Sequence, residues 1–532
     1  MVNARTARSS APGPLARGQG ADQTERDMRR TILPNRGRLL RLLAVSAAAV
    51  LAACAAVGPD YVPPQGAAPP SWHTALAGGL STRQDGARTV AHWWERFEDP
   101  VLASLVEGAL RGSPDMREAV ARVREARARR GLSRTGLFPS LDASGDAAFS
   151  GEIENEVEET VLGGDATDEG TSKRFLAGFD AGWELDLFGG VRRSVEAAEA
   201  ALQASRADLQ DVWVSLAAEI ALTYVEARTS QARLAVARAN LEAQEETLAL
   251  TRARHAAGLE SELAVQQARY NLESTRARVP AVKAGLEASL NSLAVLQGKA
   301  PGAAHEALGV GGSIPVPPVN VVVGIPALVL RQRPDVRGAE RELAAQTARI
   351  GEATADLYPR VRLTGSIGLE TLDLNRLGTT AVWPFGYGLS VQWPVFDAGR
   401  IRRSIEIQDA LQGQALARYE RTVLGALEEV ENALSSYALE QDRLAALRRA
   451  AASARAAVEL AGIRYQAGLI DFLEMLEAQR SLLGFQDQVA ESEGAVTANL
   501  VRLYKALGGG WRSMALTEGP EGTSRPKEER SG

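Results

Sequence analysis

The chain has 532 residues, of which 24% are charged and 5% aromatic, and its formal net charge is −6. Its only cysteine is Cys54, which excludes an internal disulfide framework and a cysteine-based zinc cluster. Residues 1–53 carry nine arginines against three acidic residues, so the rest of the chain is markedly acidic and a poor candidate for nucleic-acid binding.

The amino terminus is predicted to be a signal peptide that covers residues 1–53. Its basic region consists of Arg29, Arg30, Arg36, Arg38 and Arg41. The apolar run from Leu42 to Ala53 is too short to span a bilayer as a helix. It leads into Leu51-Ala52-Ala53-Cys54, which resembles a bacterial lipobox, so Cys54 is predicted to be lipidated and to begin the mature chain. The alternative is a plain signal peptide with an incidental cysteine.

Two further residues bear on processing and sorting. Ala55, rather than aspartate, follows the cysteine, and this favours sorting of the lipoprotein to the outer membrane. Residues 1–27 have mixed charge, unlike the basic region of a signal peptide. A hypothesis is therefore that translation starts at Met28, which the mass of the unprocessed precursor would test.

The chain is predicted to contain two copies of one large unit. The stretch RHAAGLESELAVQQARYN (254–271) returns as RYQAGLIDFLEMLEAQRS (464–481), 210 positions later. Upstream the offset is 220, since Pro114-Asp115 matches Pro334-Asp335. A period this long exceeds that of a solenoid repeat and indicates a tandem duplication. The offset changes between 141 and 188, so a loop of different length is expected there.

Each copy is predicted to have the same order of elements. A helix at about 115–134 or 335–355 precedes two extended segments, a very long helix, a glycine turn and a second long helix. No proline or paired glycine interrupts 191–254 or 401–464. Each of these segments would form a rod of roughly 95 Å at 1.5 Å per residue. A rod of that length cannot bury its apolar stripe alone, so neighbouring helices must line it on both sides.

Four segments alternate between apolar and polar residues. One apolar set is Phe175, Ala177, Phe179, Ala181, Trp183, Leu185 and Leu187, and another is Tyr387, Leu389, Val391, Trp393 and Val395. Similar alternation is found at 141–149 and 361–369. Alternation of this length is typical of transmembrane β-strands. The alternative is four half-buried strands of a soluble sheet.

The number of strands predicts the oligomeric state. Four strands cannot close a barrel around a channel, and an open edge in lipid would leave N–H and C=O groups unpaired at a cost of several kcal/mol each. Three copies would supply twelve strands and leave an aqueous lumen, whereas two would supply eight, which side chains would largely fill. A homotrimer is therefore expected, with the acidic stretch 152–169 as an extracellular loop.

Several motifs carry a resemblance to a known family. They are VGPDYVPP (57–64), WWERFEDPVLASLVEGAL (93–110), RPDVRGAERELAAQTARIGEATADLYPRVRLTGSIG (333–368) and the two glycine turns. With the lipobox, the chain resembles the TolC-type outer-membrane efflux family from about 54 to 511, and within it the NodT-type lipoproteins of resistance-nodulation-division pumps. This implies a mainly α fold with a small β part, in which a trimer forms a twelve-stranded outer-membrane barrel and a twelve-helix periplasmic tunnel.

The resemblance also implies a function and partners. The chain would be the exit channel of a tripartite efflux system, passively conducting drugs or other toxic small molecules. Its partners would be a periplasmic adaptor, an inner-membrane pump and outer-membrane lipid, without nucleic acid, cofactor or metal. The transported substrate, the pump and the resting state of the channel are not specified by the sequence.

The resemblance and the duplication together predict a division of the chain. After the signal peptide, residues 54–112 form the lipidated segment and part of an equatorial region, which 299–333 and the end of the chain complete. The first repeat is 113–298, with a β-hairpin at 137–188 and long helices at 190–297. The second repeat is 334–508, with a β-hairpin at 357–397 and long helices at 399–507. Residues 509–532 form an equatorial and disordered tail.

By resemblance, the two helix tips form the periplasmic mouth. The residues assigned to adaptor contacts are Arg254, Gly258, Leu259, Gly468 and Leu469, and those assigned to the aperture or gate are Glu474, Glu477, Arg464, Tyr465 and Asp471. Glu474 and Glu477 share one helical face, and six such carboxylates around one axis would favour cations. The alternative is a solvated helix face.

The first tip departs from the second. Its counterparts of Glu474 and Glu477 are Ala264 and Gln267. The first tip also departs from the family, with His255 where an aromatic residue is usual and with Glu260 and Glu262 after the glycine. Equal binding of both tips to the adaptor is therefore an open question, and His255 is interpreted as an exposed surface histidine.

The sequence also bears on function classes other than a channel. The four histidines are scattered, and Gly298-Lys299 lacks the glycine-rich lead-in of a phosphate loop, so the sequence offers no enzyme signature. A structural coiled-coil lipoprotein or a periplasmic adaptor would not need two symmetric pairs of amphipathic strands. Within the channel class, the alternative is the outer-membrane channel of a one-step protein secretion system.

Overall fold

The structure is a computed structural model that describes residues 56–64, 68–82, 91–150, 172–308, 311–372 and 382–511. The signal peptide, Cys54, Ala55, the loop at 152–169 and the tail after 511 lie outside the described residues. The chain divides into two units, residues 1–56 and 57–532, and every described helix and strand belongs to the second.

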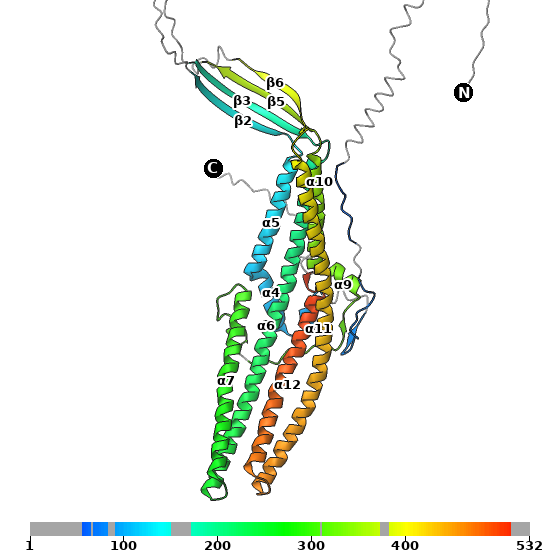
Figure 1. Ribbon diagram of the computed structural model, residues 1–532. Coiled ribbons are helices and arrows are strands. Elements are labelled where there is room, and N and C mark those ends of the chain that lie inside the picture. The colour runs from blue at the N-terminus through cyan, green and yellow to red at the C-terminus, as the bar shows by residue number, and fades with distance from the viewer. Residues whose placement is uncertain are drawn as a thin grey trace, which may run out of the picture. The chain divides into compact units, whose positions relative to one another are not determined.

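The second unit is built from two similar halves (Figure 1). In the first half, helix α5 (Pro114–Thr135) precedes strands β2 (Ser140–Ser150) and β3 (Ser172–Leu185) and helices α6 (Gly190–Ala256) and α7 (Glu262–Leu296). In the second half, α10 (Pro334–Ala355) precedes β5 (Arg360–Thr371), β6 (Phe385–Gln392), α11 (Arg400–Gln466) and α12 (Phe472–Ala506). Matched helices have 22, 67 and 35 residues in both halves, so the predicted order of helices, strands and turns is confirmed.

The two halves also repeat details of side-chain bonding. The Trp183 indole N–H donates to the Leu137 carbonyl at 3.1 Å, and that of Trp393 donates to the Leu357 carbonyl at 2.9 Å. Each long helix begins after a glycine with positive φ, 80° at Gly189 and 85° at Gly399. The two indole hydrogen bonds join the end of each strand pair to the segment that follows the preceding short helix. Together with the matching glycines, they show that both halves pass from strand to long helix in the same way.

The four long strands form one antiparallel sheet in the order β2-β3-β5-β6 (Figure 1). Strands β3 and β5 pair across the two halves, which leaves β2 and β6 at the edges. The register aligns apolar residues in rows, for example Trp183 opposite Leu363 and Leu363 opposite Leu389. One face of the sheet is therefore apolar from edge to edge, as the alternation predicts.

No other segment among the described residues covers this apolar face. Phe385, Tyr387 and Leu389 are 76%, 86% and 62% exposed. Leu187, Trp393 and Val395 were expected to extend the strands, but β3 ends at Leu185 and β6 at Gln392. Pro394, which lacks an N–H group for a ladder, follows the end of β6.

A hydrophobic core lies where the shorter elements meet the long helices. The 3-10 helix η1 (Trp93–Phe97) buries Trp93, Trp94 and Phe97, and helix α4 (Pro100–Gly112) buries Leu102, Leu105, Val106 and Ala109. Trp93 stacks on Tyr504 of α12 with ring centroids 5.4 Å apart. The aromatic residues of one predicted motif thus fasten the amino-terminal segment to the last helix.

Three distant parts of the sequence come together beside this core. Strand β1 (Leu80–Ser81) pairs in parallel with β4 (Val321–Val322). The short helices α8 (His305–Leu308) and α9 (Pro326–Gln332) flank β4 along the chain, and the Trp511 indole donates to the Gln332 carbonyl at 3.0 Å. None of the helices within the described ranges combines the length and the hydropathy needed for a membrane span.

Candidate functional site at the helix tips

The two hairpin tips are formed by the same backbone turn. At the first tip, Gly258 has a φ of 75° and the Leu259 N–H donates to the Arg254 carbonyl at 2.9 Å. At the second, Gly468 has a φ of 73° and the Leu469 N–H donates to the Arg464 carbonyl at 2.9 Å. This bonding ends each long helix with a left-handed residue, a conformation that glycine adopts without steric cost. The repeated glycine is therefore explained by the turn.

The helices that follow the two turns are capped by short polar side chains. The Ser261 hydroxyl accepts a bond from the Ala264 N–H at 3.3 Å, and the Asp471 carboxylate accepts one from the Glu474 N–H at 3.1 Å. Asp471, which was assigned to the gate, is thus the amino-terminal cap of α12. Its negative charge also complements the positive end of the helix dipole.

The tips pack together through a small core of their own. It includes Leu248 of α6, Tyr465 of α11 and residues of both return helices, namely Ala264, Val265, Ala268, Leu272, Phe472, Met475 and Leu476. Tyr465 is 1% exposed, and its ring meets that of Phe472 edge to face at 5.8 Å. The two hairpins of one chain are therefore joined at this end by apolar contacts.

Arg254 extends this contact from the first hairpin to the second. Its guanidinium lies over the Tyr465 ring, 4.7 Å from the centroid, and Nη1 donates to the Gln466 carbonyl at 3.5 Å. The Glu260 carboxylate lies 3.9 Å from Arg254 Nε. Burial raises the pKa of Tyr465 above its usual value, and the Glu260 carboxylate adds to this rise. Arg254 and Tyr465 thus face each other inside the chain.

Glu474 and Glu477 lie on the opposite, solvent-exposed side of α12. With Ala454, Ala457, Leu473, Ala478 and Ser481 they line a hollow of about 530 Å³ between α11 and α12. In the first half, the counterpart of Glu474 is Ala264, which is buried in the tip core and only 3% exposed. The two halves therefore place matched positions in different environments, and only the second half presents paired carboxylates.

The remaining residues assigned to the tips are on the surface. Leu259 and Leu469 are 66% and 72% exposed. Arg464 is exposed and forms no ion pair with any described residue. His255 is also exposed; its Nδ1 lies 2.9 Å from the Glu260 carbonyl and its Nε2 lies 3.3 Å from the Glu262 carboxylate. The structure thus brings Arg254 and Tyr465 together and leaves Arg464 and the two leucines available to other molecules.

The sequence marks Glu260 as a departure of the first tip from the family but does not predict its contact with the second hairpin. Its side chain lies under the first tip, close to both Arg254 and Tyr465. The signal in the sequence is that Glu260 replaces the apolar Ile470 of the second half. At this position the first half contacts Tyr465 of the second half, so the two copies are not equivalent here.

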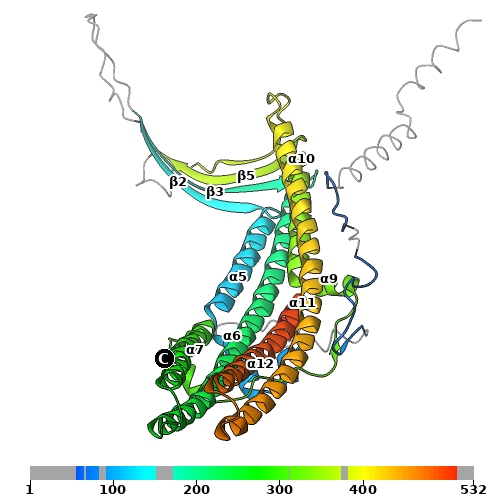
Figure 2. The same ribbon diagram turned by 60° about the horizontal axis from the view of Figure 1, so that its bottom comes forward.

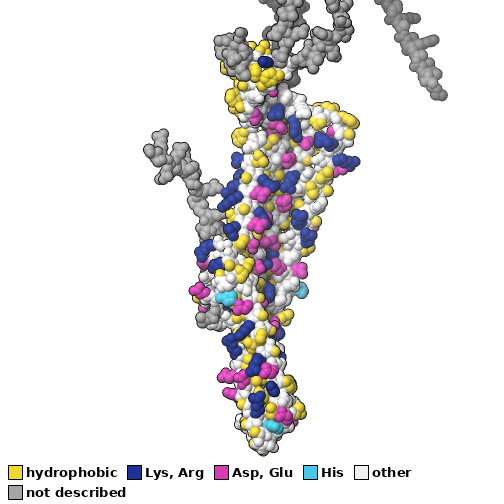
Figure 3. Space-filling model, turned by 90° about the vertical axis from the view of Figure 1, so that its left-hand side faces the viewer, with side chains coloured by type: hydrophobic (Ala, Val, Ile, Leu, Met, Phe, Trp, Pro, Cys, Tyr) yellow, Lys and Arg dark blue, Asp and Glu magenta, His cyan; other side chains and the backbone are white. Residues whose placement is uncertain are grey.

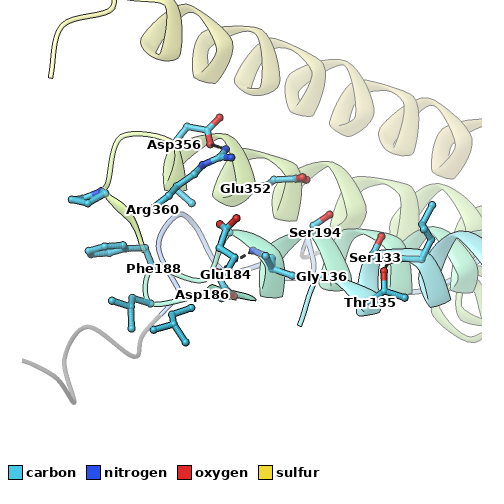
Figure 4. Close-up of a pocket in the computed structure, with 17 residues that line it drawn as sticks. Ser133, Thr135, Gly136, Glu184, Asp186, Phe188, Ser194, Glu352, Asp356 and Arg360 are labelled. Atoms are coloured by element: carbon cyan, nitrogen blue, oxygen red, sulfur yellow. Dashed lines mark hydrogen bonds and ion pairs between the residues drawn. The ribbon is translucent and has the colours of Figure 1, made fainter. Parts of the chain in front are cut away.

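A second polar hollow lies at the junction of strands and helices (Figure 4). It has a volume of about 380 Å³, and the Asp356 carboxylate pairs with the Arg360 guanidinium at its edge. The Asp186 carboxylate accepts hydrogen bonds from the backbone N–H groups of Val191 and Arg192 at 3.1 and 2.9 Å. It therefore satisfies two free N–H groups in the first turn of α6. No cluster suited to a metal ion is found among the described residues.

The surface of the helices is polar and of mixed charge. Lysine and arginine side chains alternate with aspartate and glutamate along the face drawn in Figure 3. Glu474 and Glu477 are exposed and form no ion pair with a described residue, as is also true of other exposed acids such as Glu242 and Glu246. The chemistry available at the tips is therefore electrostatic attraction and contact, with no nucleophile and base arranged for a reaction.

Comparisons with known proteins agree with this architecture. A relative, nodulation protein T of Rhizobium leguminosarum bv. trifolii, is 33% identical over 460 residues, which cover 86% of this chain and 95% of the relative. The cation efflux system protein CusC of Escherichia coli O6:H1 is 29% identical over 89% of this chain and 99% of its own. The solved outer-membrane channel OprN superposes with a TM-score of 0.77 and 37% identity over 86% of this chain and 99% of that chain.

A family model described as outer membrane efflux protein matches residues 105–299 and 325–509. These two ranges are the two halves of the duplicated fold, and together they cover well over half of the chain. Its relatives are efflux proteins and outer-membrane channels rather than enzymes. The chain therefore belongs to the outer membrane efflux protein family.

Proposed function

We propose that the chain is the exit channel of a tripartite efflux system and that it assembles as a homotrimer in the outer membrane. The observation that carries the proposal is the four-stranded sheet, whose apolar face is exposed and whose edges β2 and β6 have no partner in the described chain. Three copies would pair these edges into a closed barrel of twelve strands. No edge N–H or C=O group would then be left unpaired in lipid. The long helices would continue the conduit across the periplasm, and Cys54, if lipidated, would add a lipid anchor.

The tips support the choice of a gated conduit. Glu474 and Glu477 are exposed and bring two carboxylates per chain to the end of the second hairpin. Three copies would supply six carboxylates around one axis, an arrangement that attracts cations and repels anions. The exposed Leu259 and Leu469 would meet a periplasmic adaptor, which links the channel to an inner-membrane pump, and the exposed Arg464 stays a candidate for the gate. Drugs or other toxic small molecules are the proposed cargo. The relative CusC is by name a protein of a cation efflux system.

Single-channel recording of the purified full-length protein in planar bilayers tests this function. We expect a small conductance with a preference for cations. In the Glu474→Gln/Glu477→Gln variant the preference should fall by several fold, because the field at the narrow end is removed. The matched control is Glu242→Gln/Glu246→Gln, which removes the same charge from exposed positions on α6.

Each outcome decides a different part of the proposal. An unchanged cation preference in the Glu474 and Glu477 variant would remove these residues from the constriction. A folded protein that forms no pore under any condition would overturn the channel itself and would favour a structural lipoprotein.

A further inference from the structure

The polar face of the four-stranded sheet is hollowed. The hollow has a volume of about 480 Å³ and reaches across all four strands, and the strands are bent along their length (Figure 2). It lies over two neighbouring rows of the strand register, in which Gly182, Gly386 and Gly388 supply no side chain and Asp142 and Asp180 supply charge. Part of the floor is therefore bare backbone, which a solute can approach closely.

Two carboxylates lie directly opposite each other in this hollow. Asp142 of β2 pairs with Asp180 of β3 in the antiparallel register. Side chains at such positions have Cβ atoms about 4.5–5.5 Å apart, and like charges there repel each other. The Ser144 hydroxyl donates to Asp180 Oδ2 at 3.0 Å, but neither carboxylate forms an ion pair with a described residue. The pair therefore presents two negative charges that a cation from outside the chain would balance.

Arg362 of β5 brings a positive charge to the same hollow. The register places it opposite Glu184, yet its guanidinium lies over Gly182, where an added Cβ would be 2.8 Å from Nη2. Arg362 forms no ion pair with a described residue. Gly182 and Asp180 are two residues apart on one face of β3, a separation of about 7 Å along a strand. One small molecule could therefore reach both the guanidinium and the carboxylate pair, which do not bond each other.

The duplication shows that these charges distinguish the two halves. With the offset of 220 residues, Asp142 of the first half corresponds to Arg362 of the second. With the offset of 210 residues, Asp180 corresponds to the uncharged Ser390. A hydrated wall needs polar side chains at these positions, but it does not need charges of opposite sign. The difference between the halves therefore places both signs of charge within one hollow.

We propose that this hollow is a binding site for zwitterionic small molecules in transit. An ammonium group of the solute binds Asp142 and Asp180, and an anionic group of the same molecule binds the Arg362 guanidinium, whose N–H groups suit a carboxylate. The inference rests on the exit channel proposed above, because the polar face lines the path of the cargo only in that channel. It names one class of cargo, molecules whose opposite charges are up to about 7 Å apart. Binding must be weak, because a conducted solute has to leave the site again.

Binding of 6-aminohexanoate to the purified full-length protein tests the site. This probe carries an ammonium group and a carboxylate at the two ends of one flexible chain. The matched probes are 6-aminohexanamide, which keeps only the positive charge, and 6-acetamidohexanoate, which keeps only the negative charge. Titrations followed by saturation-transfer NMR give a Kd for each probe. We expect the zwitterion to bind about tenfold more tightly than either singly charged probe.

Charge-neutral variants assign the two ends of the probe. In Arg362→Gln, the Kd of 6-aminohexanoate should rise about tenfold, to that of 6-aminohexanamide. In Asp142→Asn/Asp180→Asn, it should rise by a similar factor, to that of 6-acetamidohexanoate. The control Asp146→Asn removes a charge from an exposed position of β2 outside the hollow and should leave the Kd unchanged. The control for the arginine is Arg238→Gln, an exposed position on α6.

Two results would overturn the inference. If the three probes bind with equal Kd, the charges of the hollow only hydrate the wall. If 6-aminohexanamide binds as tightly as the zwitterion and Arg362→Gln has no effect, the hollow attracts cations alone and Arg362 takes no part in recognition.

Single-channel recording of the same preparations separates this site from the channel on which it rests. A protein that conducts ions but does not prefer the zwitterion would overturn the site and keep the exit channel. A folded protein that forms no pore would overturn the channel, and with it the role of the hollow in transit.

If the double asparagine variant does not accumulate, the single variants replace it. Asp142→Asn and Asp180→Asn should each raise the Kd of 6-aminohexanoate by about threefold, because one carboxylate of the pair remains. Thermal unfolding of each variant checks that it is folded. Folded single variants that both bind the zwitterion as tightly as the unchanged protein would contradict the assignment of the ammonium group.

Discussion

Asp211 is a residue whose environment sets a pH dependence for the fold. Burial on α6 raises its pKa to about 6, and the Asp335 carboxylate adds to the rise. The Arg333 guanidinium opposes this effect; it bonds Asp335 at 2.7 Å and the Ala506 carbonyl at 2.7 Å. Nearby Asp208 also has a raised pKa, first from burial and then from Glu342. The contact between the two halves therefore carries two carboxyl groups whose pKa values are raised above the usual value.

The direction of the pKa shift of Asp211 determines whether the stability of the fold rises or falls with pH. The folded-state pKa of Asp211, about 6, lies above the value of about 4 in the unfolded chain. The folded protein therefore holds the proton more tightly, and this group contributes stability that grows as the pH falls from about 7 to about 4.

We expect Asp211→Asn to raise the free energy of unfolding by about 2 kcal/mol at pH 8 and to have little effect near pH 4. Thermal unfolding at both pH values measures this, with Glu226→Gln, an exposed position on the same helix, as the control. A variant that is equally stabilised at both pH values would contradict the argument.

At the scale of elements, the tips depend on a single backbone conformation. Gly258 and Gly468 have φ values of 75° and 73°, and a Cβ at either position would meet no atom within 4 Å. The requirement for glycine is therefore conformational and not a matter of space. Because the same turn occurs at the end of both long helices, its loss would loosen the end of a hairpin without changing the rod.

We expect Gly468→Ala to cost about 1 kcal/mol, because an L-residue is strained in the left-handed region. The matched control is Gly462→Ala, which lies in the helical part of α11 with equal space around it and should be stabilising by up to about 1 kcal/mol. Hydrogen exchange of the amides at 465–476 reports both changes locally. Equal effects of the two substitutions would show that the turn imposes no special conformation.

At the scale of the whole molecule, the sheet separates two environments. Its apolar face includes Leu389, which is 62% exposed, and its other face includes Ser390, whose hydroxyl bonds the Arg362 carbonyl at 3.3 Å. In the proposed trimer the first face meets lipid and the second meets water. Neighbouring residues of one strand should then respond oppositely to the same substitution.

We expect Leu389→Arg to reduce the amount of folded protein in the outer membrane strongly, because a lipid-facing arginine costs about 2–4 kcal/mol near the centre of a bilayer. Ser390→Arg should be tolerated, because the lumen face is hydrated. Quantitative immunoblots of outer-membrane fractions measure both variants. Comparable loss in both would contradict the assignment of the faces.

The sequence determined much of this protein through local periodicity. The repeat of two halves, the helices α5, α6, α10 and α11, and the apolar face of the sheet all follow from residue spacing, because helices and strands repeat every 3.6 and 2 residues. The positive φ of Gly258 and Gly468 likewise follows from the repeated glycine at a helix end. Where the expectation was wrong, at Trp393 and Val395, Pro394 ended the strand although the alternation continued.

Only the tertiary structure decided which way matched residues of the two halves face. Tyr465 is buried against Arg254, whereas its counterpart His255 is exposed, and Glu474 is exposed where Ala264 is buried. A duplication predicts equal local structure, but in one chain the inner sides of the two halves meet each other and their outer sides do not. Burial depends on that packing and not on spacing along the sequence, so the tip core emerged only from the folded arrangement.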